Sequence, residues 1–184
     1  RILMIKNNFF GEYFIKYSKL VDGLDHKKID YLYNKINKLK KDNKVMIFGN
    51  GAGASIASHV ASDLTNAAKV KSLSFDNTAQ LSCYANDYKF ENWVKKTIES
   101  YSFKDDLVIL LSASGNSKNM LNAARYCIKN KINYFSITGF KKNNKLNKIS
   151  KNFYWIDSNS YNYVESIQLL ILLSIVDKIS STKN

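Results

Sequence analysis

The stretch from residue 107 to residue 117 constrains the fold of this chain more than any other. An uninterrupted apolar run, Leu107–Leu111, is typical of a buried strand, and apolar residues recur at helical spacing from Met120 to Ile128. The turn between them holds Ser112, Ser114 and Ser117. Free N–H groups at the start of a helix stabilise phosphate, so the pattern predicts a phosphate-binding turn. Serines that only cap the helix would leave the same pattern.

A second turn of this kind lies upstream. The short apolar strand Val45–Phe48 leads into the glycine-rich turn 49–53, and a small-residue helix expected over Ala54–Ala68 follows, carrying His59 and Asp63. Two such turns predict one ligand held at the carboxyl ends of a parallel sheet. The glycine spacing is wrong for a dinucleotide fingerprint, and the Lys-Ser/Thr pair of a nucleotide P-loop is missing.

The rest of the chain alternates between helical and strand patterns. Amphipathic helices are expected over Phe9–Leu20 and His26–Lys41, a helical region over Thr78–Tyr101, and a last helix from Tyr163. Further strands are expected at Ser72–Phe75, Tyr134–Ile137 and Phe153–Ile156. This order predicts an α/β fold with a doubly wound sheet of about five parallel strands, flanked by helices. We expect one compact domain, in which an N-terminal helical segment, 1–44, precedes the main unit, 45–184.

Composition supports a globular protein. Of the 184 residues, 45% are apolar and 23% charged, and the longest apolar block is too short to span a bilayer. With no secretory signal, we expect a cytoplasmic protein whose native start is Met4, and in that compartment Cys83 and Cys127 are expected to be buried free thiols.

The net charge of +13 raises the question of nucleic-acid binding. The lysines are scattered along helices and loops and form no known binding motif, so we expect a solvated basic surface and consider a nucleic-acid partner unlikely. Such a surface attracts anionic small molecules.

The last helix contains the apolar segment Ile167–Val176, which covers nearly its whole circumference. A helix of this kind is buried on all sides, either within one subunit or against another, and we predict a homo-oligomer. Gln168 stands out there, because a buried amide needs hydrogen-bond partners.

Several short motifs together resemble a known family. They are Gly49-Asn-Gly51, His59 with Asp63, Ala85-Asn-Asp87, Ser112-Ala-Ser-Gly-Asn-Ser117 and Glu165-Ser-Ile-Gln168. In this order they resemble the sugar isomerase (SIS) domain, and most of all its phosphoheptose isomerase branch. The resemblance implies a homotetramer that converts sedoheptulose 7-phosphate to D-glycero-D-manno-heptose 7-phosphate, toward the heptose of lipopolysaccharide or capsule.

The resemblance also implies roles for individual residues. Ser112, Ser114 and Ser117 would bind the phosphate. Asn50, Gly51, Ser55, Asp87 and Glu165 would bind the sugar. A zinc site would use His59, Asp63 and Gln168, and catalysis would involve Asp63 and Gln168. The i, i+4 spacing of His59 and Asp63 independently puts an imidazole and a carboxylate on one helix face, as a metal site or a local ion pair would require.

The chain departs from the family where the chemistry occurs. Asp63 replaces a glutamate one methylene longer, and Val176 stands where the family has a second histidine that is both metal ligand and acid/base. Asn77 replaces an aspartate, and Ala52-Gly-Ala-Ser-Ile56 replaces Gly-Gly-Ser-Ala-Ala-Asp. Two functions therefore remain open: a sugar-phosphate isomerase with an altered zinc site, and a catalytically inactive protein that binds phosphosugars or assembles with other proteins.

Overall fold

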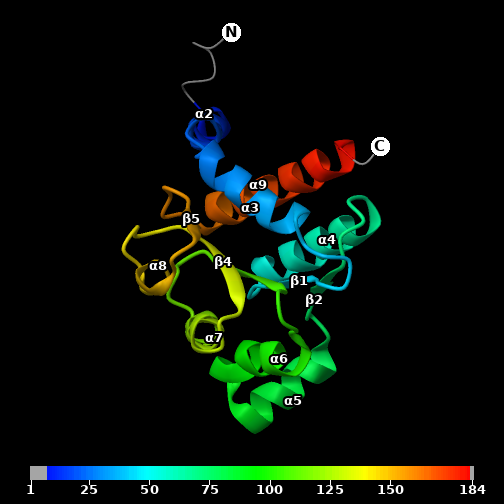
Figure 1. The fold of residues 1–184 in the computed structure, drawn as a ribbon. Coiled ribbons are helices and arrows are strands. Elements are labelled where there is room, and N and C mark those ends of the chain that lie inside the picture. The colour runs from blue at the N-terminus through cyan, green and yellow to red at the C-terminus, as the bar shows by residue number, and fades with distance from the viewer. Residues whose placement is uncertain (1–7, 183–184) are drawn as a thin grey trace.

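The computed structural model describes residues 8–182 and contains one all-parallel sheet. Its five strands lie in the order β2-β1-β3-β4-β5 (Figure 1). The strands are β1 (Val45–Phe48), β2 (Ser72–Ser74), β3 (Leu107–Ser112), β4 (Asn133–Thr138) and β5 (Phe153–Trp155). The prediction of a doubly wound α/β fold with five parallel strands is confirmed. The expected start at Met4 lies outside the described residues.

Helices cover both faces of the sheet (Figure 1). One face carries α2 (Phe9–Asp22), α3 (His26–Asn37), α4 (Ala52–Asn66) and α9 (Tyr161–Ser181). The other carries α5 (Thr78–Tyr88), the 3-10 turn η1 (Phe90–Asn92), α6 (Trp93–Tyr101) and α7 (Lys118–Lys129). The short helix α8 (Lys145–Ile149) connects β4 to β5. Helix α3 packs into the core of the main unit through Leu32 and Ile36.

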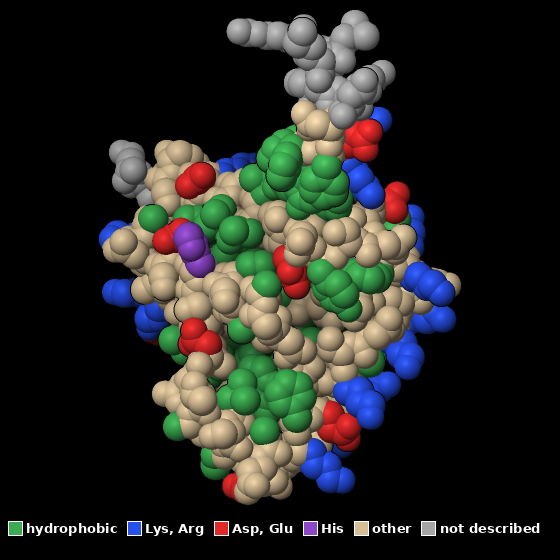
Figure 2. Space-filling model, turned by 180° about the vertical axis from the view of Figure 1, so that it is seen from behind, with side chains coloured by type: hydrophobic (Ala, Val, Ile, Leu, Met, Phe, Trp, Pro, Cys, Tyr) green, Lys and Arg blue, Asp and Glu red, His purple; other side chains and the backbone are tan. Residues whose placement is uncertain are grey.

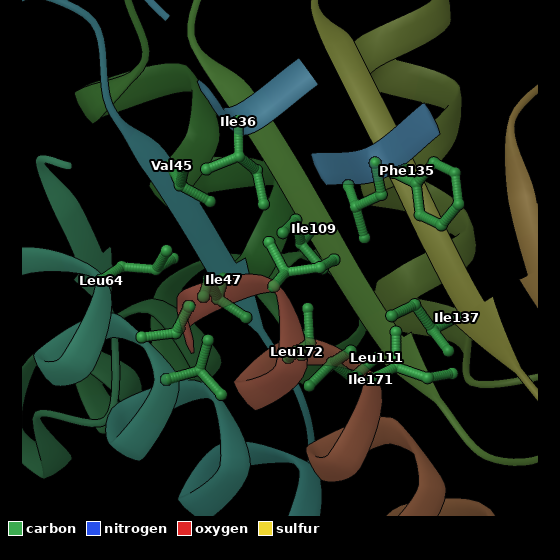
Figure 3. Packing of buried hydrophobic residues seen from close by; sticks show 14 of the residues in the cluster. Ile36, Val45, Ile47, Leu64, Ile109, Leu111, Phe135, Ile137, Ile171 and Leu172 are labelled. Carbon is green, nitrogen blue, oxygen red and sulfur yellow. The ribbon is translucent and has the colours of Figure 1, made fainter. Parts of the chain in front are cut away.

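Alternation along the strands divides the core in two. Val45 and Ile47 of β1 face α4 and α9, whereas Met46 and Phe48 face α6 and α7. All four are buried, as a parallel sheet covered on both faces requires. Figure 3 shows the first half, where side chains of β1, β3 and β4 meet those of α3, α4 and α9: Ile36, Val45, Ile47, Leu64, Ile109, Leu111, Phe135, Ile137, Ile171 and Leu172.

The apolar α9 is buried largely by its own subunit. Ile167, Ile171, Leu172 and Ile175 are at most 1% exposed, while Leu170 remains 37% exposed. The apolar circumference of this helix is therefore explained within one chain and gives no separate support for an oligomer. No helix within residues 8–182 is long and apolar enough to cross a membrane.

Three details differ from the sequence expectation. The helical region 78–101 is interrupted at Lys89, whose φ of 67° ends α5 before η1 and α6 begin. Helix α8 was not expected, although Asn144 caps it by accepting a hydrogen bond from the Asn147 N–H. The expectation that both thiols are buried was wrong for Cys83. Cys127 is buried, but Cys83 is exposed because α5 lies on the surface and buries none of its residues.

Candidate functional site

The strand order has its switch point between β1 and β3. From β1 the chain crosses to β2 on one side, whereas from β3 it crosses to β4 on the other. Loops that leave two such strands diverge, and ligands of doubly wound sheets bind outside the carboxyl ends of the strands at this switch point. The two turns predicted from the sequence, 49–53 and 112–117, follow β1 and β3, and in the structure the loops themselves are residues 49–51 and 113–117. The topology therefore brings both turns to the position predicted for a ligand.

The serine turn is held in shape by its own hydrogen bonds. The Gly115 N–H donates to the Ser112 carbonyl oxygen at 2.9 Å, and the Asn116 N–H donates to Ser114 Oγ at 3.2 Å. Gly115 has a φ of 64°, which a glycine adopts without strain. Ser112 is buried and its hydroxyl donates to Ser117 Oγ at 3.2 Å, while Ser114 and Ser117 are partly exposed. Ser114 and Ser117 are thus the hydroxyls that a ligand can reach.

The helices that follow the two turns begin without side-chain caps. Ser117 is the N-cap residue of α7 and Gly51 that of α4, and neither makes a side-chain capping hydrogen bond. The alternative that the serines only cap the helix does not describe this structure, because the Ser117 hydroxyl instead pairs with Ser112. Orphan N–H groups and the positive end of each helix dipole favour an anion at this point.

Two asparagines join the turns to each other. Asn50 Nδ2 donates to Asn119 Oδ1 at 3.1 Å, and Asn119 Nδ2 donates to Asn50 Oδ1 at 2.8 Å. Asn119 is 2% exposed and was not among the predicted site residues. The sequence did contain a signal for Asn119, because it is a polar residue on the apolar face of the predicted helix, the face expected to be buried. The pair fixes the start of α7 against the turn after β1, where Asn50 had been expected to bind the sugar.

The glycine turn after β1 keeps a close backbone approach despite its altered sequence. A Cβ on Gly49 would collide with the backbone of Gly53, so no larger side chain fits at position 49. Gly51 and Ser55 are exposed at the mouth of the turn. Both are accessible from solvent, and their predicted contact with a sugar stays a prediction.

The side chains of His59 and Asp63 are in contact on the surface of α4. His59 Nε2 lies 3.0 Å from Asp63 Oδ2, and their side chains are 57% and 42% exposed. The predicted i, i+4 pairing is therefore present. The Asp63 carboxylate remains accessible to solvent.

Three positions of α9 matter to the predicted site, and each lies in a different environment: 165, 168 and 176. Gln168 is 1% exposed, and its Nε2 donates to the carbonyl oxygen of Ile137 in β4 at 2.8 Å. Val176 is 3% exposed and packs in the core. Glu165 is partly buried, and this desolvation raises the pKa of its carboxyl above that of an ordinary glutamate. Of the three, Glu165 has the environment of an acid or base.

These residues do not make a zinc site. Zinc takes three or four nitrogen, sulfur or oxygen ligands, and only His59 and Asp63 are in contact. Gln168 is the third candidate and could offer only its Oε1, since its Nε2 donates to β4, while Val176 in place of the family's histidine offers no ligand atom. Across the described part of the chain, no group of three or more His, Cys, Asp or Glu side chains could hold a metal ion.

The candidate sugar ligand Asp87 lies on the exposed helix α5. Its carboxylate accepts hydrogen bonds from Cys83 Sγ at 3.6 Å and from Asn86 Nδ2 at 3.0 Å. Asn77, which replaces an aspartate of the family, caps α5 by accepting from the Gln80 N–H at 3.1 Å. An amide performs this capping as well as a carboxylate does, so the substitution preserves the local fold.

Comparisons with known proteins agree with this geometry. The SIS domain family matches residues 13–139. The phosphoheptose isomerase of Helicobacter pylori strain Shi470 is 31% identical over 166 residues, 86% of this chain and 85% of that protein. The phosphoheptose isomerase of Helicobacter hepaticus is 31% identical over 153 residues, 79% of this chain and 77% of its own length.

Solved structures share the fold. Phosphoheptose isomerase GmhA from Neisseria gonorrhoeae superposes with a TM-score of 0.84 at 18% identity, covering 92% of this chain and 97% of its own. The Vibrio vulnificus NanR protein complexed with ManNAc-6P gives a TM-score of 0.66 at 18% identity, over 90% of this chain and 58% of its own. The matched sequence and the turns at the switch point lead to one assignment: this chain belongs to the SIS domain family and, within it, to the phosphoheptose isomerases.

Proposed function

We propose that this protein is an aldose–ketose isomerase acting on sedoheptulose 7-phosphate and forming D-glycero-D-manno-heptose 7-phosphate, or on a closely related sugar phosphate. The product would enter heptose synthesis for surface polysaccharide, in the cytoplasm. The observation that carries the proposal is the pair of uncapped helix starts at the β1–β3 switch point, one of them lined by reachable serine hydroxyls.

The substrate is held mainly through its phosphate group. In the proposed complex it lies on the start of α7, where Ser114, Ser117 and the N–H groups of the turn donate to its oxygens. The buried Ser112 hydroxyl donates a hydrogen bond to Ser117 Oγ and so orients the Ser117 hydroxyl. The sugar chain then extends toward Asn50, Gly51, Ser55, Asp87 and Glu165.

The reaction moves one proton between adjacent carbons. A base removes a proton from C1 of the ketose while the C2 carbonyl oxygen takes up a proton, giving an enediol. A proton is then returned to C2, and O1 loses its proton as the aldehyde forms. Asp63 is the proposed base for the carbon proton. Glu165, whose raised pKa makes it a better base than an ordinary glutamate, exchanges the oxygen protons.

Gln168 has a positioning role in this scheme. Its amide nitrogen is committed to the β4 backbone, so it holds the first turns of α9, and with them Glu165, against the sheet. The scheme routes no step through zinc, because the residues that remain do not complete a ligand set. Any zinc held by His59 and Asp63 alone would bind weakly.

We further propose that the protein is a homotetramer. Helix α2 leaves Phe9, Phe10 and Phe14 exposed by 72%, 69% and 64%. Figure 2 shows this hydrophobic patch beside the N-terminal end of the described chain, on a face where Lys and Arg side chains lie mainly at the edges. Large apolar areas on a protein surface mark interaction sites, and a second copy would cover this one.

A second function is favoured by one specific observation. Val176 removes the donor that the family places eight residues after the glutamine and buries an apolar side chain instead. A protein that binds a sugar phosphate without converting it would keep the serine turn and tolerate this change. Such a protein would act as a regulator or an assembly partner.

One experiment separates the two functions. Purified protein of known metal content is incubated with sedoheptulose 7-phosphate, with and without added zinc, while NMR follows the aldose phosphate and thermal shift follows binding. The isomerase predicts product formation. A stabilising shift without product would assign the second function. The absence of both product and shift would contradict both functions.

A further inference from the structure

The serine turn does not stand alone, because the segment that connects β4 to α8 packs against it. Three hydrogen bonds join the two segments. The Gly139 N–H donates to the Ala113 carbonyl oxygen at 2.8 Å, the Leu146 N–H donates to that of Gly115 at 2.9 Å, and the Lys145 N–H donates to Asn116 Oδ1 at 3.2 Å. The shape of the turn thus depends on residues 139–146.

Asn144 lies at the centre of this contact. It is 4% exposed, and its Nδ2 lies within hydrogen-bond distance of Thr138 Oγ1, the Gly139 carbonyl and the Lys141 carbonyl, at 3.2, 3.3 and 3.0 Å. Its Oδ1 accepts from the Asn147 N–H at 2.9 Å. A side chain with its oxygen and nitrogen engaged in this way is held in one rotamer, and it forms a rigid support.

The amide group of Asn144 also packs against Gly115. A Cβ built on Gly115 would collide with Cγ, Oδ1 and Nδ2 of Asn144, so the glycine and the amide occupy complementary space. Gly115 is also the residue whose positive φ turns the chain back toward Ser117. Position 115 therefore requires glycine for two reasons: the backbone is left-handed, and Asn144 occupies the space that a side chain would need.

We infer that Asn144 is a positioning residue for phosphate binding: by supporting Gly115, it holds the N–H groups and hydroxyls of residues 114–117 in the arrangement that a phosphate needs. The inference rests on the proposed function for its consequence in catalysis, but its structural part stands independently. It assigns to the β4–α8 segment a share in substrate affinity, although Asn144 contacts no substrate in the proposed complex.

The chain offers a matched control in Asn147. This residue is 6% exposed, lies in the same short helix, and has its side-chain oxygen and nitrogen bonded to Thr138 Oγ1 at 2.8 Å and to the Lys142 carbonyl at 3.0 Å. Asn147 is not among the atoms nearest to Gly115. Asn144→Ala and Asn147→Ala each remove a buried amide and should lower the melting temperature, and Asn144→Ala should lower it further because it also removes the cap of α8.

The test compares these variants by hydrogen exchange and by kinetics. In Asn144→Ala, amide exchange should speed up in residues 113–117, and KM for sedoheptulose 7-phosphate should rise about tenfold, the loss expected for one hydrogen bond to a charged group. In Asn147→Ala both should match the wild type. Partial unfolding alone would lower kcat and leave KM unchanged, so the KM change reports positioning.

A double variant examines the contact itself. Gly115→Ala should weaken substrate binding on its own, and combining it with Asn144→Ala should restore part of the affinity because the collision is removed. Equal exchange and equal KM in Asn144→Ala and Asn147→Ala, or no recovery in the double variant, would overturn the inference. If the wild type shows no turnover, the proposed function fails, while the exchange data still decide the role of Asn144.

Discussion

The phosphate turn and the His59–Asp63 pair are two halves of one proposed site, and they are built very differently. The turn is supported by hydrogen bonds from β3, α7 and the β4–α8 segment, and its glycine is packed against a buried amide. The His59–Asp63 pair is a single contact on the surface of one helix. The difference teaches that the proposed binding half is held in shape by several buried contacts, whereas the proposed catalytic half has only an exposed side-chain pair on one helix.

The sharpest way to separate the two halves is to remove the proposed base. Asp63→Asn should lower kcat about a hundredfold or more, because general base catalysis commonly contributes a factor of 10²–10⁴. Phosphate binding should persist, since position 63 lies outside the serine turn. Steady-state kinetics and thermal shift with sedoheptulose 7-phosphate measure both. A kcat within threefold of the wild type would remove Asp63 from the mechanism.

The reverse change tests the binding half. Ser117→Ala removes a hydroxyl that can reach the phosphate and should raise KM about tenfold, with a smaller change in kcat. Ser18→Ala, an exposed serine on α2, is the control and should leave both constants unchanged. An unchanged KM in Ser117→Ala would place the phosphate elsewhere.

Glu165 offers a smaller effect that is read from pH. Burial raises the pKa of its carboxyl, and the base form must be ionised, so kcat/KM should fall as pH decreases through a value above 4.5, the ordinary pKa of glutamate. In Glu165→Gln this acid limb should move to lower pH in the residual activity. A pH profile of the two proteins measures the shift. The same limb in both would assign it to another group.

The smallest effect is expected from metal removal. Because only His59 and Asp63 are paired as possible ligands, dialysis against a chelator should leave kcat within about twofold of the untreated protein. Metal analysis before and after dialysis is the control. A loss of activity that added zinc restores would contradict this and would imply ligands from a neighbouring subunit.

The sequence predicts the scaffold of the site well, for physical reasons. Apolar runs such as Leu107–Leu111 are long enough to define buried strands, and the polar residues that end them mark the turns. Parallel strands bring such turns to one edge without further information. Contact between His59 and Asp63 likewise follows from helix geometry alone.

Other features depend on contacts that no local pattern encodes. Asn50 and Asn119 are 69 residues apart in the chain. Asn144, which packs against Gly115, precedes a helix of only five residues, too short for a clear sequence pattern. Burial of α9 by its own subunit, exposure of Cys83 and the break at Lys89 are also set by tertiary packing. The resemblance to a family only predicts what positions 168 and 176 do, and it was the structure that showed Gln168 bonded to β4 and Val176 buried in the core.

The central claim is that residues 114–119 hold the ligand's phosphate and that the start of α4 lies beside the bound sugar. The most direct test is an NMR titration of labelled protein with sedoheptulose 7-phosphate, following every resolved backbone amide. The account predicts saturable shifts centred on the amides of 114–119 and 52–54. Shifts confined to the lysine-rich loops, with these amides unchanged, would contradict it.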